Sequence, residues 1–206
     1  MDFYHNLITQ KSWQLLTNLK KRYEFILIGG WAVFLYTKAL KSKDIDVVME
    51  FEELEKMRNE FAVSKNERLR KYEARKEETE IDIYVPFYSN PGIPAEEIKK
   101  FTSQLEGFIV AQKEVLAVLK QKAFLERRNT PKGRKDLADL VSLFCLEDFD
   151  WQKYRNLVGN YRLEAEAAAV AQIINQTFSL EEIGLNVHQM ARLKAKILPK
   201  IEKKDG

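Results

Sequence analysis

Two aspartates separated by a single residue, Asp44 and Asp46, are well suited to bind a divalent cation. Residues i and i+2 of a strand point to the same side, so the two carboxylates would act as a pair while Ile45 faces the core. Mg²⁺ and Mn²⁺ are hard ions that prefer such oxygen ligands. Asp82 lies in a second alternating stretch and could serve as a third metal ligand or as a general base, with Glu80 as the substitute.

A pair of glycines, Gly29 and Gly30, lies upstream between the apolar run 25–28 and a helical pattern that begins at Trp31. Glycine lets the backbone approach a phosphate closely, and a helix N-terminus supplies unpaired N–H donors with a favourable dipole. The order of strand, glycine turn, helix and Asp-x-Asp strand therefore predicts a phosphate site next to a metal site. Trp31, Phe34 and Tyr36 could stack on a base, but aromatic residues on a helix directly behind a turn favour the core.

The periodicity of apolar residues divides the chain into a mixed half and a helical half. In the first half, helices are expected at 3–23, 31–40 and 52–61, and strands at 25–28, 44–49, 68–74 and 80–85. A loop rich in proline and glycine ends this half near residue 94, and a short strand at 108–110 is an option. Further helices are expected at about 113–128, 134–146, 150–157, 160–177 and 186–202.

These elements predict a fold of the α/β class, of the α+β type. A small mixed sheet flanked by helices would be followed by a C-terminal helical bundle. We expect a catalytic domain at 1–94 and a mainly helical domain at 95–206 that completes the cleft.

The composition excludes several other kinds of site. Cys145 is the only cysteine, which excludes an internal disulfide and a multi-cysteine zinc site, and neither His5 nor His188 has the spacing of a metal ligand or a catalytic triad. The net charge of +3 is too small to identify a polyanion-binding protein. The sequence has neither a long apolar stretch nor a signal-peptide pattern, so we expect a cytoplasmic protein without a membrane partner.

The order of these motifs resembles the polymerase β-like nucleotidyltransferase superfamily. More narrowly, the stretches 28–33 and 41–47 resemble the AbiEii and MenT-type toxins. Those proteins typically have Gly-Gly-Thr/x-Ala, then a basic residue, Ser or Thr, any residue, and Asp-x-Asp. The resemblance implies that Lys41 and Ser42 help Gly29 and Gly30 to bind the nucleotide.

The resemblance continues in the helical half. Residues 115–127 are similar to a family helix that carries a lysine, which Lys120 matches better than Lys122 does. Residues 134–140 are similar to the family's Arg-Asp-x-x-Asp-Leu helix. These matches imply that Lys120 contacts phosphate and that Asp136 belongs to the catalytic site.

Simpler roles are open for the same residues of the helical half. Lys120 could be an exposed helix lysine, and Asp136 could pair with Arg127 or Arg128. Asp139, on the same helix face as Asp136, could be a satisfied helix carboxylate. Surface ion pairs of this kind are common and weak.

Three positions depart from the family pattern. Gly30 stands where serine is common in the wider superfamily, so backbone amides must bind the phosphate there. Lys41 and Lys135 stand where arginine is common, which keeps the charge but loses bidentate phosphate geometry.

Together the motifs imply a transferase of the EC 2.7.7 type that depends on Mg²⁺ or Mn²⁺. It would move a nucleoside monophosphate from an NTP such as ATP to a hydroxyl of an RNA, a tRNA, a protein or a small molecule. In the toxin reading, the protein belongs to a toxin–antitoxin pair and has an antitoxin protein as a partner. The alternative is a catalytically inactive module of the same fold that binds nucleotide or RNA, which the intact carboxylates Asp44, Asp46 and Asp82 disfavour.

Overall fold

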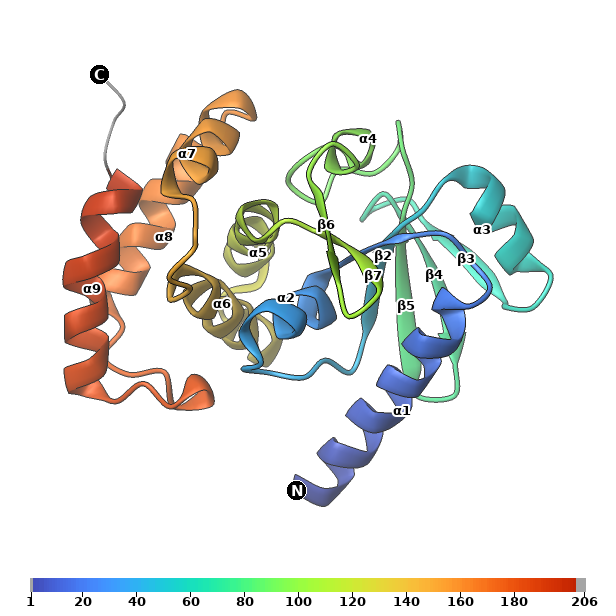
Figure 1. The fold of residues 1–206 in the computed structure, drawn as a ribbon, viewed down its shortest axis with the longest axis horizontal. Coiled ribbons are helices and arrows are strands. Elements are labelled where there is room, and N and C mark those ends of the chain that lie inside the picture. Colours follow the sequence, from blue (N-terminus) through green and yellow to red (C-terminus); the bar gives the residue numbers. More distant parts are fainter. Residues whose placement is uncertain (1, 203–206) are drawn as a thin grey trace. The chain divides into compact units, whose positions relative to one another are not determined.

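The computed structural model describes residues 2–202, with side chains described from 6 to 201 (Figure 1). Two compact units follow one another along the chain, the first through Gln112 and the second from Lys113. His5, which the sequence assigns no site role, lies outside the residues with described side chains. No helix among the described residues has the length and apolar character needed to cross a membrane.

The first unit is built around a seven-stranded mixed sheet in the order β3-β4-β5-β2-β1-β7-β6. Its elements are α1 (Asp2–Lys20), β1 (Ile26–Ile28), α2 (Gly29–Thr37), β2 (Ile45–Val48), α3 (Phe51–Arg58), β3 (Val63–Asn66), β4 (Lys71–Lys76), β5 (Thr79–Tyr84), α4 (Ala95–Ile98), β6 (Thr102–Leu105) and β7 (Phe108–Ala111). β2 runs antiparallel to β1 and parallel to β5, while β7 runs parallel to β1. The short connection from β1 to α2 therefore lies beside the start of β2.

Alternation along the central strands decides which side chains enter the core. Ile45, Ile81 and Ile83 are fully buried, and the aspartates between or before them are half-buried. This is the period of two that a strand with one polar and one apolar face requires. β2 and β5 thus direct their carboxylates to one common face.

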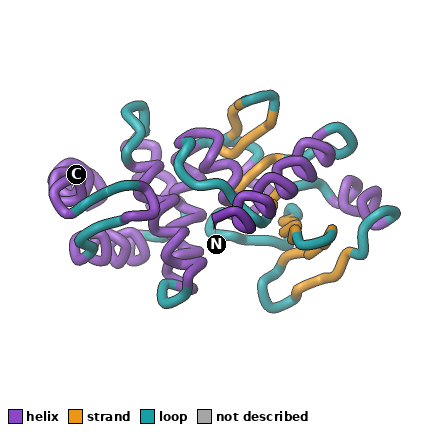
Figure 2. The backbone as a smooth tube through the Cα atoms, turned by 90° about the horizontal axis from the view of Figure 1, so that it is seen from below, coloured by secondary structure: helices purple, strands orange, loops and turns teal. Residues whose placement is uncertain are grey.

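The second unit contains only helices among its described regular elements, whereas all strands belong to the first, as the colours of Figure 2 make visible. Its elements are α5 (Lys113–Arg127), α6 (Pro131–Phe144), α7 (Trp151–Asn160), α8 (Glu164–Gln176), a 3₁₀ turn η1 (Glu181–Ile183) and α9 (Val187–Glu202). Thr130 caps α6 by accepting a hydrogen bond from the Gly133 amide at 3.0 Å, and Pro131 occupies the first turn. Both features are favoured at helix starts.

The α+β fold class predicted from the sequence is confirmed, but the sheet is larger than expected. The sequence pattern predicts neither β3 nor β6. β3 lacks the apolar alternation that marks a strand, because it is a polar strand at the sheet edge. β6 and β7 extend the sheet on its other side, so residues 95–112 belong to the first unit rather than to the helical one. The sequence places the domain boundary after residue 94, whereas the two compact units of the structure meet after Gln112.

Candidate functional site

Gly29 lies directly against Asp46. Its backbone has a φ of +66°, a conformation that costs side-chain-bearing residues about 1–2 kcal/mol. A Cβ atom at this position would lie 2.0 Å from Oδ2 of Asp46 and 2.6 Å from its Cβ. The glycine turn and the Asp-x-Asp strand, identified separately in the sequence, are thus in contact, and only glycine fits between them.

Replacing Gly29 by alanine is expected to displace the Asp46 carboxylate and lower any activity that depends on it by about a hundredfold, as displacements near 1 Å in an active site do. Gly184→Ala is the matched control, because Gly184 also has a positive φ, +71°, but has nothing within 4 Å of an added Cβ. Both variants should lose stability in thermal unfolding, and only Gly29→Ala should also lose activity. Equal activity in the two variants would contradict the contact.

Asp46 and Asp82 lie side by side on the neighbouring parallel strands β2 and β5. Asp46 pairs in register with Asp82, and Asp44 comes immediately before β2. The negative charge of Asp44 contributes to raising the pKa of Asp82, as expected for carboxylates that lie close together. Glu80, the substitute for Asp82, is instead exposed and pairs with Arg75 at 3.6 Å. Asp82 is therefore the carboxylate of β5 in register with Asp46, whereas the Glu80 side chain pairs with Arg75.

The third predicted carboxylate, Asp82, forms an ion pair with a lysine. Nζ of Lys71 lies 2.6 Å from Oδ2 of Asp82 and 3.1 Å from Oε1 of Glu73, and only 10% of the Lys71 side chain is exposed. Asn66 holds Glu73 by donating a hydrogen bond of 2.9 Å to the same Oε1 atom. Sequence reasoning missed Lys71 and Glu73, since lysine and glutamate on a polar strand carry no signal until the register of β4 and β5 is known.

The pKa values of this pair follow from burial and from the neighbouring charges. Burial raises the pKa of Asp82, and Glu73 and Asp44 add to the rise, while the Lys71 ammonium works against it. For Lys71 burial alone would lower the pKa, but Asp82 and Glu73 outweigh it and raise the value. Lys71 is therefore a protonated, nearly buried cation at neutral pH.

The other residues expected to bind nucleotide in this unit surround the start of α2 and the loop before β2. Gly30 is buried, and no side chain caps the first turn of α2, which also lacks acidic residues. Lys41 is exposed and Ser42 is buried. Trp31 is a core residue, with 2% of its surface exposed and its indole N–H donating to Oγ of Ser12 at 2.9 Å.

No group of three or more His, Cys, Asp or Glu side chains arranged to hold a metal ion occurs within residues 6–201. Of the three predicted metal ligands, Asp46 and Asp82 lie side by side on β2 and β5, and Asp44 lies just before β2. Asp82 forms an ion pair with Lys71.

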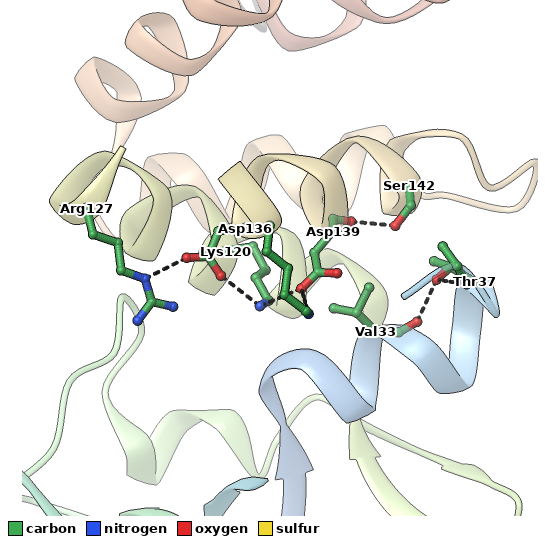
Figure 3. A network of polar contacts seen from close by, with 9 residues as sticks. Val33, Thr37, Lys120, Arg127, Asp136, Asp139 and Ser142 are labelled. Atoms are coloured by element: carbon green, nitrogen blue, oxygen red, sulfur yellow. Dashed lines mark hydrogen bonds and ion pairs between the residues drawn. The ribbon is translucent and has the colours of Figure 1, made fainter. Parts of the chain in front are cut away.

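The second unit contains a separate buried network centred on Lys120 (Figure 3). Nζ of Lys120 lies 2.9 Å from Oδ1 of Asp136 and 2.7 Å from Oδ2 of Asp139. Arg127 donates from Nε to Oδ2 of Asp136 at 2.7 Å, and Lys135 reaches Oδ2 of Asp139 at 3.0 Å. The simpler expectation of an exposed Lys120 is wrong, because only 9% of its side chain is accessible. Asp136 does pair with Arg127, as expected, but the Asp136 side chain is buried and the pair is not a surface ion pair.

Asp136 provides a test of this network through pH. Burial works to raise the pKa of Asp136, but Lys120 and Arg127 outweigh it and hold the value below normal. A depressed pKa in the folded state stabilises the protein above the unfolded value near 4, and this contribution is lost as the pH falls through the folded value.

Asp136→Asn is therefore expected to lower the free energy of unfolding by about 2–3 kcal/mol at pH 7, a loss of charge-assisted hydrogen bonds. The gap to wild type should begin to narrow below about pH 4, where Asp136 of the unfolded wild-type chain takes up a proton, and should close as the pH falls through the lower pKa of the folded state. Urea unfolding of both proteins at pH 7, 5 and 3.5 measures this difference in the free energy of unfolding. A gap that does not change with pH would show that the charge of Asp136 contributes nothing.

Comparisons with known proteins agree with this architecture. No protein-family model matches the sequence, and no curated protein matches it. Among solved structures, a proposed nucleotidyltransferase from H. pylori has a TM-score of 0.53 at 20% identity, over 96% of this chain and 98% of that one. The chain has a nucleotidyltransferase-like fold.

Two further solved structures are similar to this chain with lower TM-scores. JHP933 from Helicobacter pylori has a TM-score of 0.49 at 16% identity, over 90% of this chain and 88% of that one. An antigenic nucleotidyltransferase-like protein from Paracoccidioides brasiliensis has a TM-score of 0.41 at 14% identity, over 79% and 91%. At these identities the likeness concerns the fold.

Proposed function

We propose that this protein is a metal-dependent nucleotidyltransferase that moves a nucleoside monophosphate from an NTP to a hydroxyl group. The observation that carries the proposal is the contact between Gly29 and Asp46, which puts the glycine turn directly against a carboxylate. The register of Asp46 with Asp82 supplies a second carboxylate beside it. Fold similarity alone would not distinguish an enzyme from an inactive relative.

Asp44 and Asp46 supply the carboxylate oxygens that a divalent ion such as Mg²⁺ or Mn²⁺ prefers. Asp44 and Asp46 would hold it, because both are half-buried and lie two residues apart at the start of β2. Gly29 has no side chain to displace the Asp46 carboxylate, which lies where a Cβ atom would be. When bound, the ion would neutralise the triphosphate and stabilise the pyrophosphate leaving group.

The chain's own groups would perform the remaining tasks. Backbone amides at Gly29 and Gly30 would bind phosphate oxygens at the start of α2. Asp82 would orient the acceptor hydroxyl and take up its proton, for which a raised pKa is suited. By resemblance, Lys41 and Ser42 would add phosphate contacts.

For the second unit, the resemblance implies phosphate binding by Lys120. Asp136 and Asp139 would then act as positioning residues, because their carboxylates fix the ammonium group at 2.9 Å and 2.7 Å. Such supporting contacts hold a functional side chain in one geometry.

The resemblance to AbiEii and MenT-type toxins favours an RNA or a protein as the acceptor, and an antitoxin as the partner. The alternative is an inactive module that only binds nucleotide or RNA. The inactive module has the weaker support, because the chain keeps all three carboxylates, Asp44, Asp46 and Asp82, which a protein that only binds nucleotide or RNA does not need.

Incubation with α-labelled NTPs, total RNA and cell lysate tests the proposal, with Mg²⁺ or Mn²⁺ present or removed by EDTA. We expect covalent label in the RNA or the protein fraction only when the ion is present. Nucleotide binding without label in either fraction, at every ion and NTP tried, would support the inactive module instead.

A further inference from the structure

Lys71 has no counterpart in the motifs read from the sequence, yet it lies at the centre of the acidic face. Its ammonium group bridges Asp82 at 2.6 Å and Glu73 at 3.1 Å. β4 pairs with β5 so that Glu73 is directly opposite Asp82, and β2 pairs with β5 so that Asp46 is opposite Asp82 on the other side. Three neighbouring strands therefore present carboxylates in one row, and the single ammonium group of Lys71 pairs with two of them.

Lys71 is built into the fold. The residue as a whole is 8% exposed, and Asn66 binds Glu73 from the neighbouring strand β3. A lysine is almost never buried to this degree unless it is paired. The buried ammonium thus has a defined place at Asp82, unlike the exposed Lys76 at the other end of the same strand.

The position of this ammonium conflicts with a second divalent ion. A Mg²⁺ ion ligated by Oδ2 of Asp82 would lie within about 5 Å of Nζ of Lys71, given metal–oxygen distances of about 2 Å and the 2.6 Å contact. The ion would also compete with the ammonium group for that oxygen, so the ion pair would have to break before the ion could bind there. Asp44 and Asp46, by contrast, belong to a different strand from the Lys71–Asp82 pair.

We propose that Lys71 is a built-in cation of the acidic face that takes the place of one divalent ion at Asp82. The cluster then binds a single divalent ion through Asp44 and Asp46. This inference rests on the proposed function for the role of the ion, but it concerns how many ions the carboxylates accept and not whether transfer occurs.

The test is a titration with Mn²⁺ alone, without nucleotide or acceptor, in which calorimetry and the EPR signal of free Mn²⁺ report the number of ions bound per chain. Wild type is expected to bind one ion, and Lys71→Met two. Lys76→Met removes the same charge from the same strand and should bind one. Wild-type binding of two ions, or an unchanged number and affinity in Lys71→Met, would overturn the proposal.

A double variant keeps the test decisive where Lys71→Met fails to fold. Lys71→Met with Asp82→Asn removes the ion pair as a unit, and exchanging a buried pair for neutral groups is often tolerated. If Lys71 occupies Asp82, this variant keeps the single wild-type ion with affinity changed by less than about tenfold, the lower limit for loss of a supporting group. Loss of an ion relative to wild type would show that Asp82 is a metal ligand.

The outcome is separable from that of the proposed function. Wild type that binds two ions and transfers label keeps the function and rejects the role of Lys71. Wild type that binds one ion and gains a second in Lys71→Met, without label transfer in any variant, keeps the role of Lys71 and rejects the function.

Discussion

Asp46→Asn is expected to lower nucleotidyl transfer by about a thousandfold, the upper range for loss of one electrostatic group at a reacting centre. Asparagine keeps the shape of the side chain that Gly29 makes room for, so the fold should be retained. It loses the negative charge that would bind the ion and leaves Asp44 as the remaining ligand on β2. Initial rates of transfer from an α-labelled NTP measure the effect.

The control for this variant is Glu80→Gln. Glu80 precedes Asp82 by two residues on β5, but its side chain is 51% exposed and pairs with Arg75. Removing its charge should leave the rate within about threefold, since exposed pairs contribute little. An Asp46→Asn protein with more than a tenth of wild-type activity would contradict a metal site at Asp46, and a strong loss in Glu80→Gln would shift the site towards that residue.

Lys120→Met is expected to lower the free energy of unfolding by about 3–5 kcal/mol, the usual cost of breaking a buried ion pair by removing one partner. Asp136 and Asp139 have side chains that are 2% and 0% exposed, so the variant would leave two buried carboxylates with fewer cations. The Oδ1 atom of Asp139 already has no hydrogen-bond partner among the described residues. Urea unfolding followed by circular dichroism measures the change.

Lys122→Met is the matched control, because Lys122 lies two residues away on α5 and is more exposed. Its effect should remain within about 0.5 kcal/mol, as for most surface substitutions. A loss below about 1 kcal/mol in Lys120→Met would contradict the buried network.

The elements with a clean apolar period could be predicted from the sequence. The strands around Leu27, Val47 and Ile83 and the helices of the second unit are present within a few residues of their expected bounds. Ile45 is buried between two half-buried aspartates, as the alternation of Asp44, Ile45 and Asp46 predicts. In these segments local pattern and tertiary burial agree.

Features that depend on strand register could not be predicted. Neither the pairing of Asp82 with Glu73 nor the position of Lys71 follows from their spacing, since both arise when β4 pairs with β5. The edge strand β3 is polar because its outer side chains face solvent, which removes the alternating signal. The burial of Lys120 was likewise hidden, because a lysine on a helix is exposed unless two carboxylates on a neighbouring helix balance its charge.

The central claim is that the α-phosphate of an NTP moves to a hydroxyl, and the position of the label tests it most directly. Parallel reactions with total RNA and lysate would use one NTP labelled at the α-phosphate or at the γ-phosphate. For a nucleotidyltransferase, the α-label is expected to become covalently attached to RNA or protein, while the γ-label leaves in pyrophosphate. Attachment of γ-label, or of neither label with the nucleotide bound, would contradict it.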